Sequence, residues 1–142
     1  MTREDIVALV TRRQQAIEGR DAAALASLYA ETCVVESPTA GGPVTGRAAI
    51  VQLFQTFFVH AFPDSVATFE DPIIDGDRVT QLLNLAGTGS GSFLGLLPTG
   101  KPYRITMVLM TTVKDHHFVH ERRIYDFTGL LVQIGGFKAK PV

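Results

Sequence analysis

Apolar positions near the start of the chain recur at intervals of three and four residues, the spacing of one helix face. The first such run consists of Ile6, Leu9, Val10, Ala16 and Ile17. Thr2 and Asp5 before it resemble a capping box, and Gly19 after it is a typical helix stop. Asp21 can cap a second helix, which would carry Leu25, Leu28 and Tyr29. The pattern predicts two helices ahead of a short strand at 33–36.

A third helical pattern begins near Arg47, and Pro63 ends it. Its broad apolar face consists of Ile50, Leu53, Phe54, Phe57 and Phe58. Beyond it, strand-like segments follow at 66–74, 79–88, 103–113 and 117–127, and the turn sequence DGDR joins the first two at 75–78. Helices followed by such a meander predict an α+β cone, a curved, mostly antiparallel sheet whose N-terminal helices cover a central pocket.

Composition narrows the class of protein. The 142 residues fit one domain, 1–142, and 46% hydrophobic residues can build a core. A net charge of −1 with dispersed Lys and Arg argues against nucleic acid as a partner. We expect no membrane span and no signal peptide, because no apolar stretch of about 18 residues occurs and acids appear early in MTREDIVALV. The single cysteine, Cys33, suits the cytoplasm.

Four segments carry a resemblance to a known family: FPD at 62–64, DGDRV at 75–79, GTGSGSFLGLLPTGK at 87–101 and DFTGLLVQIG at 126–135. In their order and spacing they resemble the SnoaL-like polyketide cyclases of the NTF2-like superfamily. The resemblance implies a cone-shaped fold, a homodimer, and a cofactor-independent intramolecular aldol cyclisation with Asp126 as the acid or base. The chain departs from the family at Gly89, where many members have His in the sequence GTHxG.

Asp126 leads the candidate catalytic residues. In a regular strand it shares a face with His120 and Arg122, either of which could stabilise an oxyanion. A carboxylate at the mouth of an apolar cone suits a general base. The alternative is that Asp126 caps the last helical turn through the amide of Thr128 or Gly129, and that Arg122 is a surface charge.

Candidate substrate-binding residues are those that could line the interior of the cone: Tyr29, Phe54, Phe58, Phe62, Arg104 and Met110. Most of the aromatic ones could equally be core. We expect neither a metal nor a cofactor. His116 and His120 lie on one strand face and His117 on the other, so the three cannot converge on an ion.

Two classes of function remain open. The first is an enzyme, an aldol cyclase acting on a hydrophobic carbonyl compound, with an isomerase or epoxide hydrolase as related possibilities. An epoxide hydrolase of this fold would need an Asp–Arg–Asp set, for which the sequence offers no convincing second Asp. The other class is a non-catalytic protein that binds a hydrophobic ligand or dimerises, in which Asp126 only caps the last turn.

Overall fold

The computed structural model describes residues 1–137, and it has the order of elements that the sequence predicts. The helices are α1 (Arg3–Glu18), α2 (Ala22–Ser27), the 3₁₀ turn η1 (Pro38–Ala40), α3 (Arg47–Phe54), its π-helical continuation η2 (Gln55–Ala61), and α4 (Phe127–Gln133). The strands are β1 (Tyr29–Glu36), β2 (Val44–Thr45), β3 (Val66–Phe69), β4 (Ile73–Asp75), β5 (Arg78–Thr88), β6 (Pro102–Lys114) and β7 (His117–Ile124).

Helix α1 begins and ends where its sequence predicts. The Thr2 hydroxyl accepts a hydrogen bond from the Asp5 amide at 3.1 Å, and the Asp5 carboxylate accepts one from the Thr2 amide at 2.8 Å. Gly19 is the C-cap. The buried face of the helix contains the predicted apolar residues together with one charged residue, Arg13.

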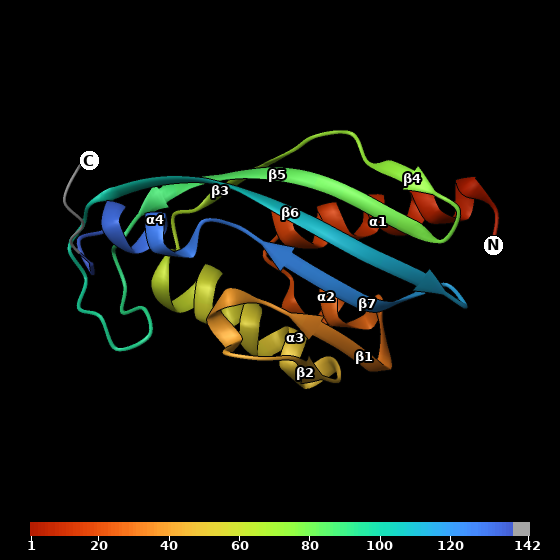
Figure 1. Ribbon diagram of the computed structural model, residues 1–142, viewed down its shortest axis with the longest axis horizontal. Coiled ribbons are helices and arrows are strands. Elements are labelled where there is room, and N and C mark those ends of the chain that lie inside the picture. The colour runs from red at the N-terminus through yellow and green to blue at the C-terminus, as the bar shows by residue number, and fades with distance from the viewer. Residues whose placement is uncertain (138–142) are drawn as a thin grey trace.

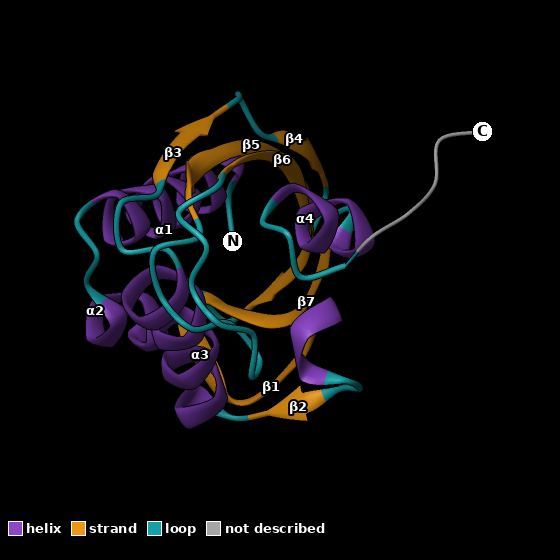
Figure 2. Ribbon diagram, turned by 90° about the vertical axis from the view of Figure 1, so that its left-hand side faces the viewer, coloured by secondary structure: helices purple, strands orange, loops and turns teal. Residues whose placement is uncertain are grey.

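The strands form one mixed, mostly antiparallel sheet in the order β2-β1-β7-β6-β5-β3, with β4 also paired to β5. Only the pairing of β1 with β7 is parallel within the described residues. Figure 1 shows β5 and β6 as the long axis of the molecule, and Figure 2 shows the sheet curling around an interior that α1, α2 and α3 close on the other side. The predicted α+β fold is confirmed.

Two predicted elements differ from those in the structure. The single strand expected at 66–74 is two strands, β3 and β4, because Pro72 interrupts the segment and has no amide hydrogen to donate to the ladder. Tyr29, expected on the second helix, is the first residue of β1, since α2 ends at Ser27. This change places the Tyr29 ring inside the sheet, where it is 1% exposed.

The helical segment α3–η2 supplies the aromatic part of the core. Phe54 stacks on Phe58 at a centroid distance of 4.9 Å, and Phe57 meets Phe62 edge-on at 4.8 Å. Two buried clusters result, one beneath α1 and α2 and the other beside α4. Within residues 1–137, no helix is long and apolar enough to cross a membrane.

Candidate functional site

An apolar cavity lies between the helices and the inner faces of β6 and β7. It is partly open to solvent, and apolar side chains form most of its wall. Its wall consists of Ile17, Leu25, Tyr29, Ser37, Thr39, Leu53, Phe54, Phe57, Phe58, Met107, Leu109, Glu121, Arg123 and Tyr125. The polar members gather on one side, from β1, β7 and the segment around η1. A mainly apolar hollow with a few polar groups on its wall has the lining typical of a small-molecule site.

A β-bulge decides which side chains of β7 face this cavity. Thr112 pairs with His120, but the next residue of β6, Val113, pairs with Phe118, so Val119 is an extra residue in β7. The bulge reverses the alternation along the strand. Phe118 and Glu121 therefore both point inward, and they are fully buried.

Glu121 is the centre of a buried polar cluster, which we call the Glu121 cluster: Arg13, Tyr29, Thr111, Glu121 and Arg123. Its Oε1 accepts hydrogen bonds from Arg13 Nη1 at 2.8 Å and from the Tyr29 hydroxyl at 2.7 Å. Its Oε2 accepts one from Arg123 Nε at 2.7 Å. Both oxygens of this carboxylate are thus engaged.

Arg13 reaches the Glu121 cluster from α1 and is completely buried. Its Nη1 also donates to the Thr111 hydroxyl at 2.8 Å, and its guanidinium lies 4.5 Å from the centre of the Phe118 ring. Its Nε and Nη2 have no hydrogen-bond partner among residues 1–137. Two positive charges therefore meet one negative charge in this cluster.

The ionisation of the cluster follows from these contacts. Burial alone would raise the pKa of Glu121, but the guanidinium groups of Arg123 and Arg13 outweigh burial and hold that pKa below its ordinary value. Burial and the adjacent Glu121 charge raise the pKa of Tyr29. Glu121 is therefore a fixed anion and Tyr29 a fixed hydrogen-bond donor near neutral pH.

Arg123 and Tyr125 stand where the cavity opens. Both line the cavity and also a shallower hollow formed with Ser37, Pro38 and Pro43. The buried Tyr125 hydroxyl lies close to the Thr39 side chain, but no hydrogen bond of good geometry joins it to any of the described residues. Burial raises the pKa of Tyr125, and the Arg123 charge and the nearby Thr39 side chain oppose the rise, so the hydroxyl stays protonated. These two side chains offer hydrogen-bond donors at the entrance of an apolar space.

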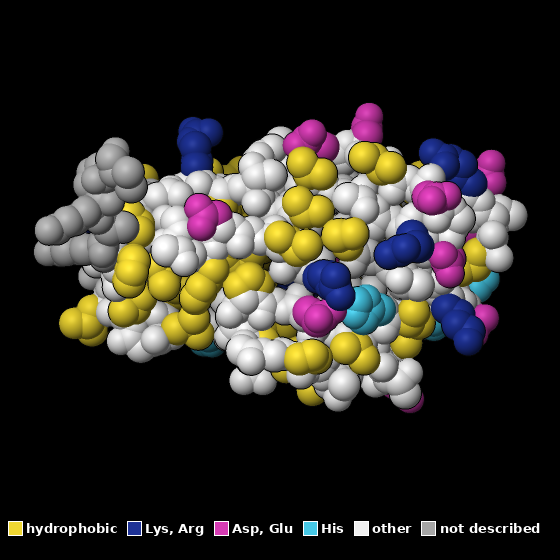
Figure 3. All heavy atoms as spheres, viewed as in Figure 1, with side chains coloured by type: hydrophobic (Ala, Val, Ile, Leu, Met, Phe, Trp, Pro, Cys, Tyr) yellow, Lys and Arg dark blue, Asp and Glu magenta, His cyan; other side chains and the backbone are white. Residues whose placement is uncertain are grey.

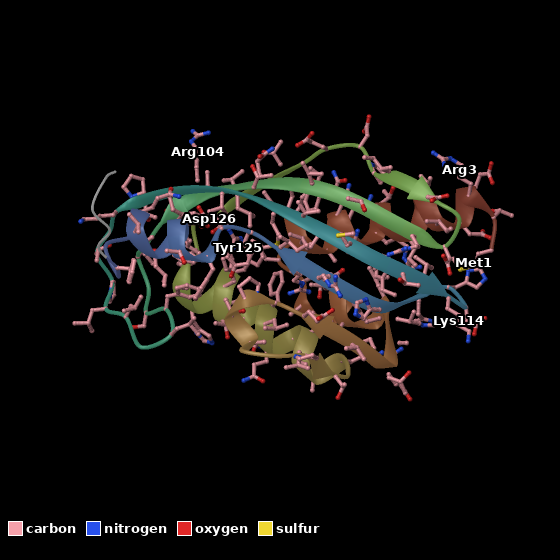
Figure 4. All side chains as sticks on the ribbon, in the orientation of Figure 1. Met1, Arg3, Arg104, Lys114, Tyr125 and Asp126 are labelled. Atoms are coloured by element: carbon pink, nitrogen blue, oxygen red, sulfur yellow. The ribbon has the colours of Figure 1, made fainter. Side chains whose placement is uncertain are left out.

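Asp126 has a different role in the structure from the one expected of a base. Its side chain is exposed, and its Oδ1 accepts a hydrogen bond from the Gly129 amide at 2.8 Å, which makes Asp126 the N-cap of α4. Figure 4 shows Tyr125 and Asp126 at the end of β7, beside α4. The capping alternative is confirmed, and a catalytic role of Asp126 stays a prediction.

His120 and Arg122 lie on the outer face of the sheet. Both contact Glu36, with His120 Nε2 at 3.0 Å and Arg122 Nε at 3.1 Å from Glu36 Oε2. Figure 3 shows basic, acidic and histidine side chains gathered on this face of β7, next to apolar side chains over β5 and β6. His120 and Arg122 therefore do not line the cavity, because the bulge turns Glu121 and Arg123 inward, and a catalytic role of either stays a prediction.

Three of the six expected substrate-binding residues line the cavity, and three do not. Tyr29, Phe54 and Phe58 line the cavity. Phe62 is buried in the aromatic cluster, and Met110 lies by a hollow of the outer face near His120 and Arg122. Arg104 projects outward from β6, away from the interior (Figure 4). The inward-facing methionine of this strand is Met107, three residues away.

Position 89 lies apart from the cavity. A Cβ on Gly89 would meet the Ile134 side chain at 3.3 Å, so this position packs against the segment just after α4. A family-type histidine would need room that Ile134 occupies. Within residues 1–137, no group of three or more His, Cys, Asp or Glu side chains could hold a metal ion.

Sequence reasoning missed Arg13, Glu121, Arg123 and Tyr125. The available signal was Arg13, because it interrupts an apolar helix face at a core position, and a buried cation requires a buried anion. Glu121 is that anion.

Comparison with known proteins gives the family. The model of the SnoaL-like polyketide cyclase family matches residues 8–134. IdmH of Streptomyces antibioticus, a candidate polyketide cyclase, is 30% identical with a TM-score of 0.71 over 90% of this chain and 96% of its own. A SnoaL-like candidate cyclase from Jannaschia is 21% identical with a TM-score of 0.82, over 95% of this chain and 94% of its own.

A protein of Catenulispora acidiphila with a ketosteroid isomerase-like fold is 22% identical with a TM-score of 0.73, over 89% of this chain and 92% of its own. Likeness at these lower identities concerns the fold alone. No curated protein matches the chain. Since the family match spans residues 8–134, the chain belongs to the SnoaL-like polyketide cyclase family and has a ketosteroid isomerase-like fold.

Proposed function

We propose that this protein is a cofactor-independent enzyme that forms an enolate from a hydrophobic carbonyl compound in its cavity and directs an intramolecular aldol cyclisation. The observation that carries the proposal is the unpaired Tyr125 hydroxyl at the cavity wall, beside Arg123. A buried donor without a partner is costly, and a substrate oxygen would satisfy it.

The reaction would proceed as follows. A carbon beside the substrate carbonyl loses a proton to solvent water, and the resulting enolate oxygen accepts hydrogen bonds from Tyr125 and Arg123. The enolate carbon then attacks a second carbonyl of the same molecule, forming a carbon–carbon bond and an alkoxide that takes up a proton. Donors placed in advance in an apolar site stabilise the developing oxyanion, and the aromatic wall from α3 and η2 holds the chain folded for attack.

The family resemblance and the geometry differ on which group accepts the proton. The only acid lining the cavity within the described residues is Glu121, and two arginines engage its carboxylate. Asp126 does not line the cavity, and its Oδ1 accepts a hydrogen bond from the Gly129 amide. An Asp–Arg–Asp set of the epoxide hydrolase kind is not found among the residues that line the cavity.

A single hydroxyl deletion tests the proposal. Tyr125→Phe should lower product formation from a hydrophobic 1,3-dicarbonyl compound with a tethered ketone by about a hundredfold, the usual cost of losing one oxyanion donor. Tyr103→Phe is the matched control, because the Tyr103 hydroxyl is hydrogen-bonded to the Ser65 hydroxyl and Tyr103 does not line the cavity. Equal rates for the wild type and Tyr125→Phe would refute the proposed role.

A non-catalytic ligand-binding protein is the second candidate. The engagement of Glu121 favours it, because binding needs no free base. Saturable binding of the same carbonyl compounds without turnover by the wild type would decide for this candidate.

A further inference from the structure

The Glu121 cluster leaves an excess positive charge beside an apolar cavity. Arg13 and Arg123 each contact Glu121, and no other acidic residue lines the cavity within residues 1–137. Glu36 lines the shallower hollow that Arg123 and Tyr125 form with Ser37, Pro38 and Pro43, but its carboxylate contacts His120 and Arg122. The remaining titratable groups on the wall, Tyr29 and Tyr125, stay neutral near pH 7 because burial raises the pKa of each. Among the described residues, therefore, no group on the cavity wall compensates the excess charge.

From this charge balance we infer that the cavity selects its substrate in ionised form, as the enolate or phenolate of an acidic, hydrophobic carbonyl compound. The inference rests on the proposed function and extends it. The acidic proton passes to solvent before or during binding, so the protein needs no base of its own. This accounts for a cavity in which, over residues 1–137, the one acid of the wall is engaged in ion pairs.

The chemistry of the wall favours a delocalised anion. Arg123 uses its Nε to bind Glu121, and a guanidinium carries five N–H donors in all, so further donors remain for a ligand. Tyr125 contributes its hydroxyl. An enolate or phenolate spreads its charge into an apolar carbon frame and therefore loses less on leaving water than a compact ion does. The aromatic side chains Phe54, Phe57 and Phe58 would contact that frame.

The test uses 4-nitrophenol, whose phenolate absorbs at longer wavelength than the phenol, and its neutral methyl ether 4-nitroanisole. The wild type should bind both, and the midpoint of the phenolate absorbance should fall by about one pH unit on binding, a tenfold preference for the anion. Arg123→Gln should abolish this fall. Arg13→Met should also abolish the fall in the midpoint. Arg13 does not line the cavity, so it acts on the bound probe through its charge alone.

The matched control is Arg122→Gln, which removes the same charge from the adjacent position of β7. Its side chain is 55% exposed and faces away from the cavity, so the fall should remain. Binding of both probes with an unchanged or raised midpoint in the wild type would overturn this inference and leave the proposed cavity intact. Failure of the wild type to bind either probe would overturn the proposed function, and this inference with it.

Discussion

Replacement of Glu121 by Gln is the most informative perturbation of stability. Glu121 is the only described acid in contact with Arg13 and Arg123, at 2.8 and 2.7 Å, and its side chain is fully buried. The substitution keeps the shape but leaves two guanidinium groups without a counter-charge. Removing one member of a buried ion pair costs about 3–5 kcal/mol. We expect Glu121→Gln to lose about 4 kcal/mol of unfolding free energy within that range.

Arg13→Met gives the comparison that makes this magnitude meaningful. Glu121 would keep Arg123 and the Tyr29 hydroxyl as partners, and two unpaired nitrogens of Arg13 would disappear. Each unsatisfied buried group costs about 1–3 kcal/mol, so their removal offsets much of the lost ion pair. We expect a loss below about 2 kcal/mol for this variant.

The assay is urea unfolding followed by far-ultraviolet circular dichroism, since the chain has no tryptophan to report by fluorescence. The midpoint and slope are measured for both variants at pH 7. A loss below about 1 kcal/mol for Glu121→Gln would refute the reasoning, since that is less than a broken buried pair costs. An Arg13→Met variant less stable than Glu121→Gln would refute it equally.

Three further outcomes follow from the same contacts. The pKa of Glu121 is lowered on folding, so the stabilisation from its charge is present above the ordinary value of 4.5 and is lost as the pH falls below that value. The difference in unfolding free energy between wild type and Glu121→Gln should therefore narrow once the pH is lowered below 4.5. Asp126→Asn retains a capping side chain and should keep both stability and turnover, whereas Asp126→Ala should lose about 1 kcal/mol in the same urea assay. A large loss of turnover in Asp126→Asn would restore the carboxylate as the base. Gly91→Ala should lower the free energy of unfolding by about 1–3 kcal/mol, because a Cβ at position 91 would overlap the carbonyl oxygen of His60. Gly42→Ala is the control, because no other atom lies near a Cβ at that position.

Local signals in the sequence were sufficient for most of the fold. The capping pair of Thr2 and Asp5 and the turn at 75–78 act over a few residues, so they hold in any tertiary context. The strand expected at 66–74 failed at Pro72, a residue whose effect on a ladder is also local and could have been recognised.

The candidate site could not be read in the same way, because its orientation depends on pairing between strands. Alternation places His120, Arg122 and Asp126 on one face of a regular strand, and the expectation of Asp126 as a base in the pocket assigned that face to the interior. In the structure Glu121, Arg123 and Tyr125 line the cavity instead, and nothing in the composition of the segment announces the bulge at Val119 that puts Glu121 on the same side as Phe118. Asp126 raised a different difficulty, since the same residue type suits both a helix cap and a base.

The bulge at Val119 gives insertions and deletions in β7 unequal consequences. Loss of Val119 itself would leave a regular ladder with Phe118, Glu121 and Arg123 still inside. Deletion of Arg122 would reverse the inward and outward faces of the residues that follow it, so Arg123 and Tyr125 would point to solvent. A deletion of one residue before Glu121 would therefore leave the cavity wall unchanged. A deletion of one residue after Glu121 would replace the side chains at the cavity entrance. The substrate range of related chains could in this way diverge through changes in strand length, with no substitution in the wall itself.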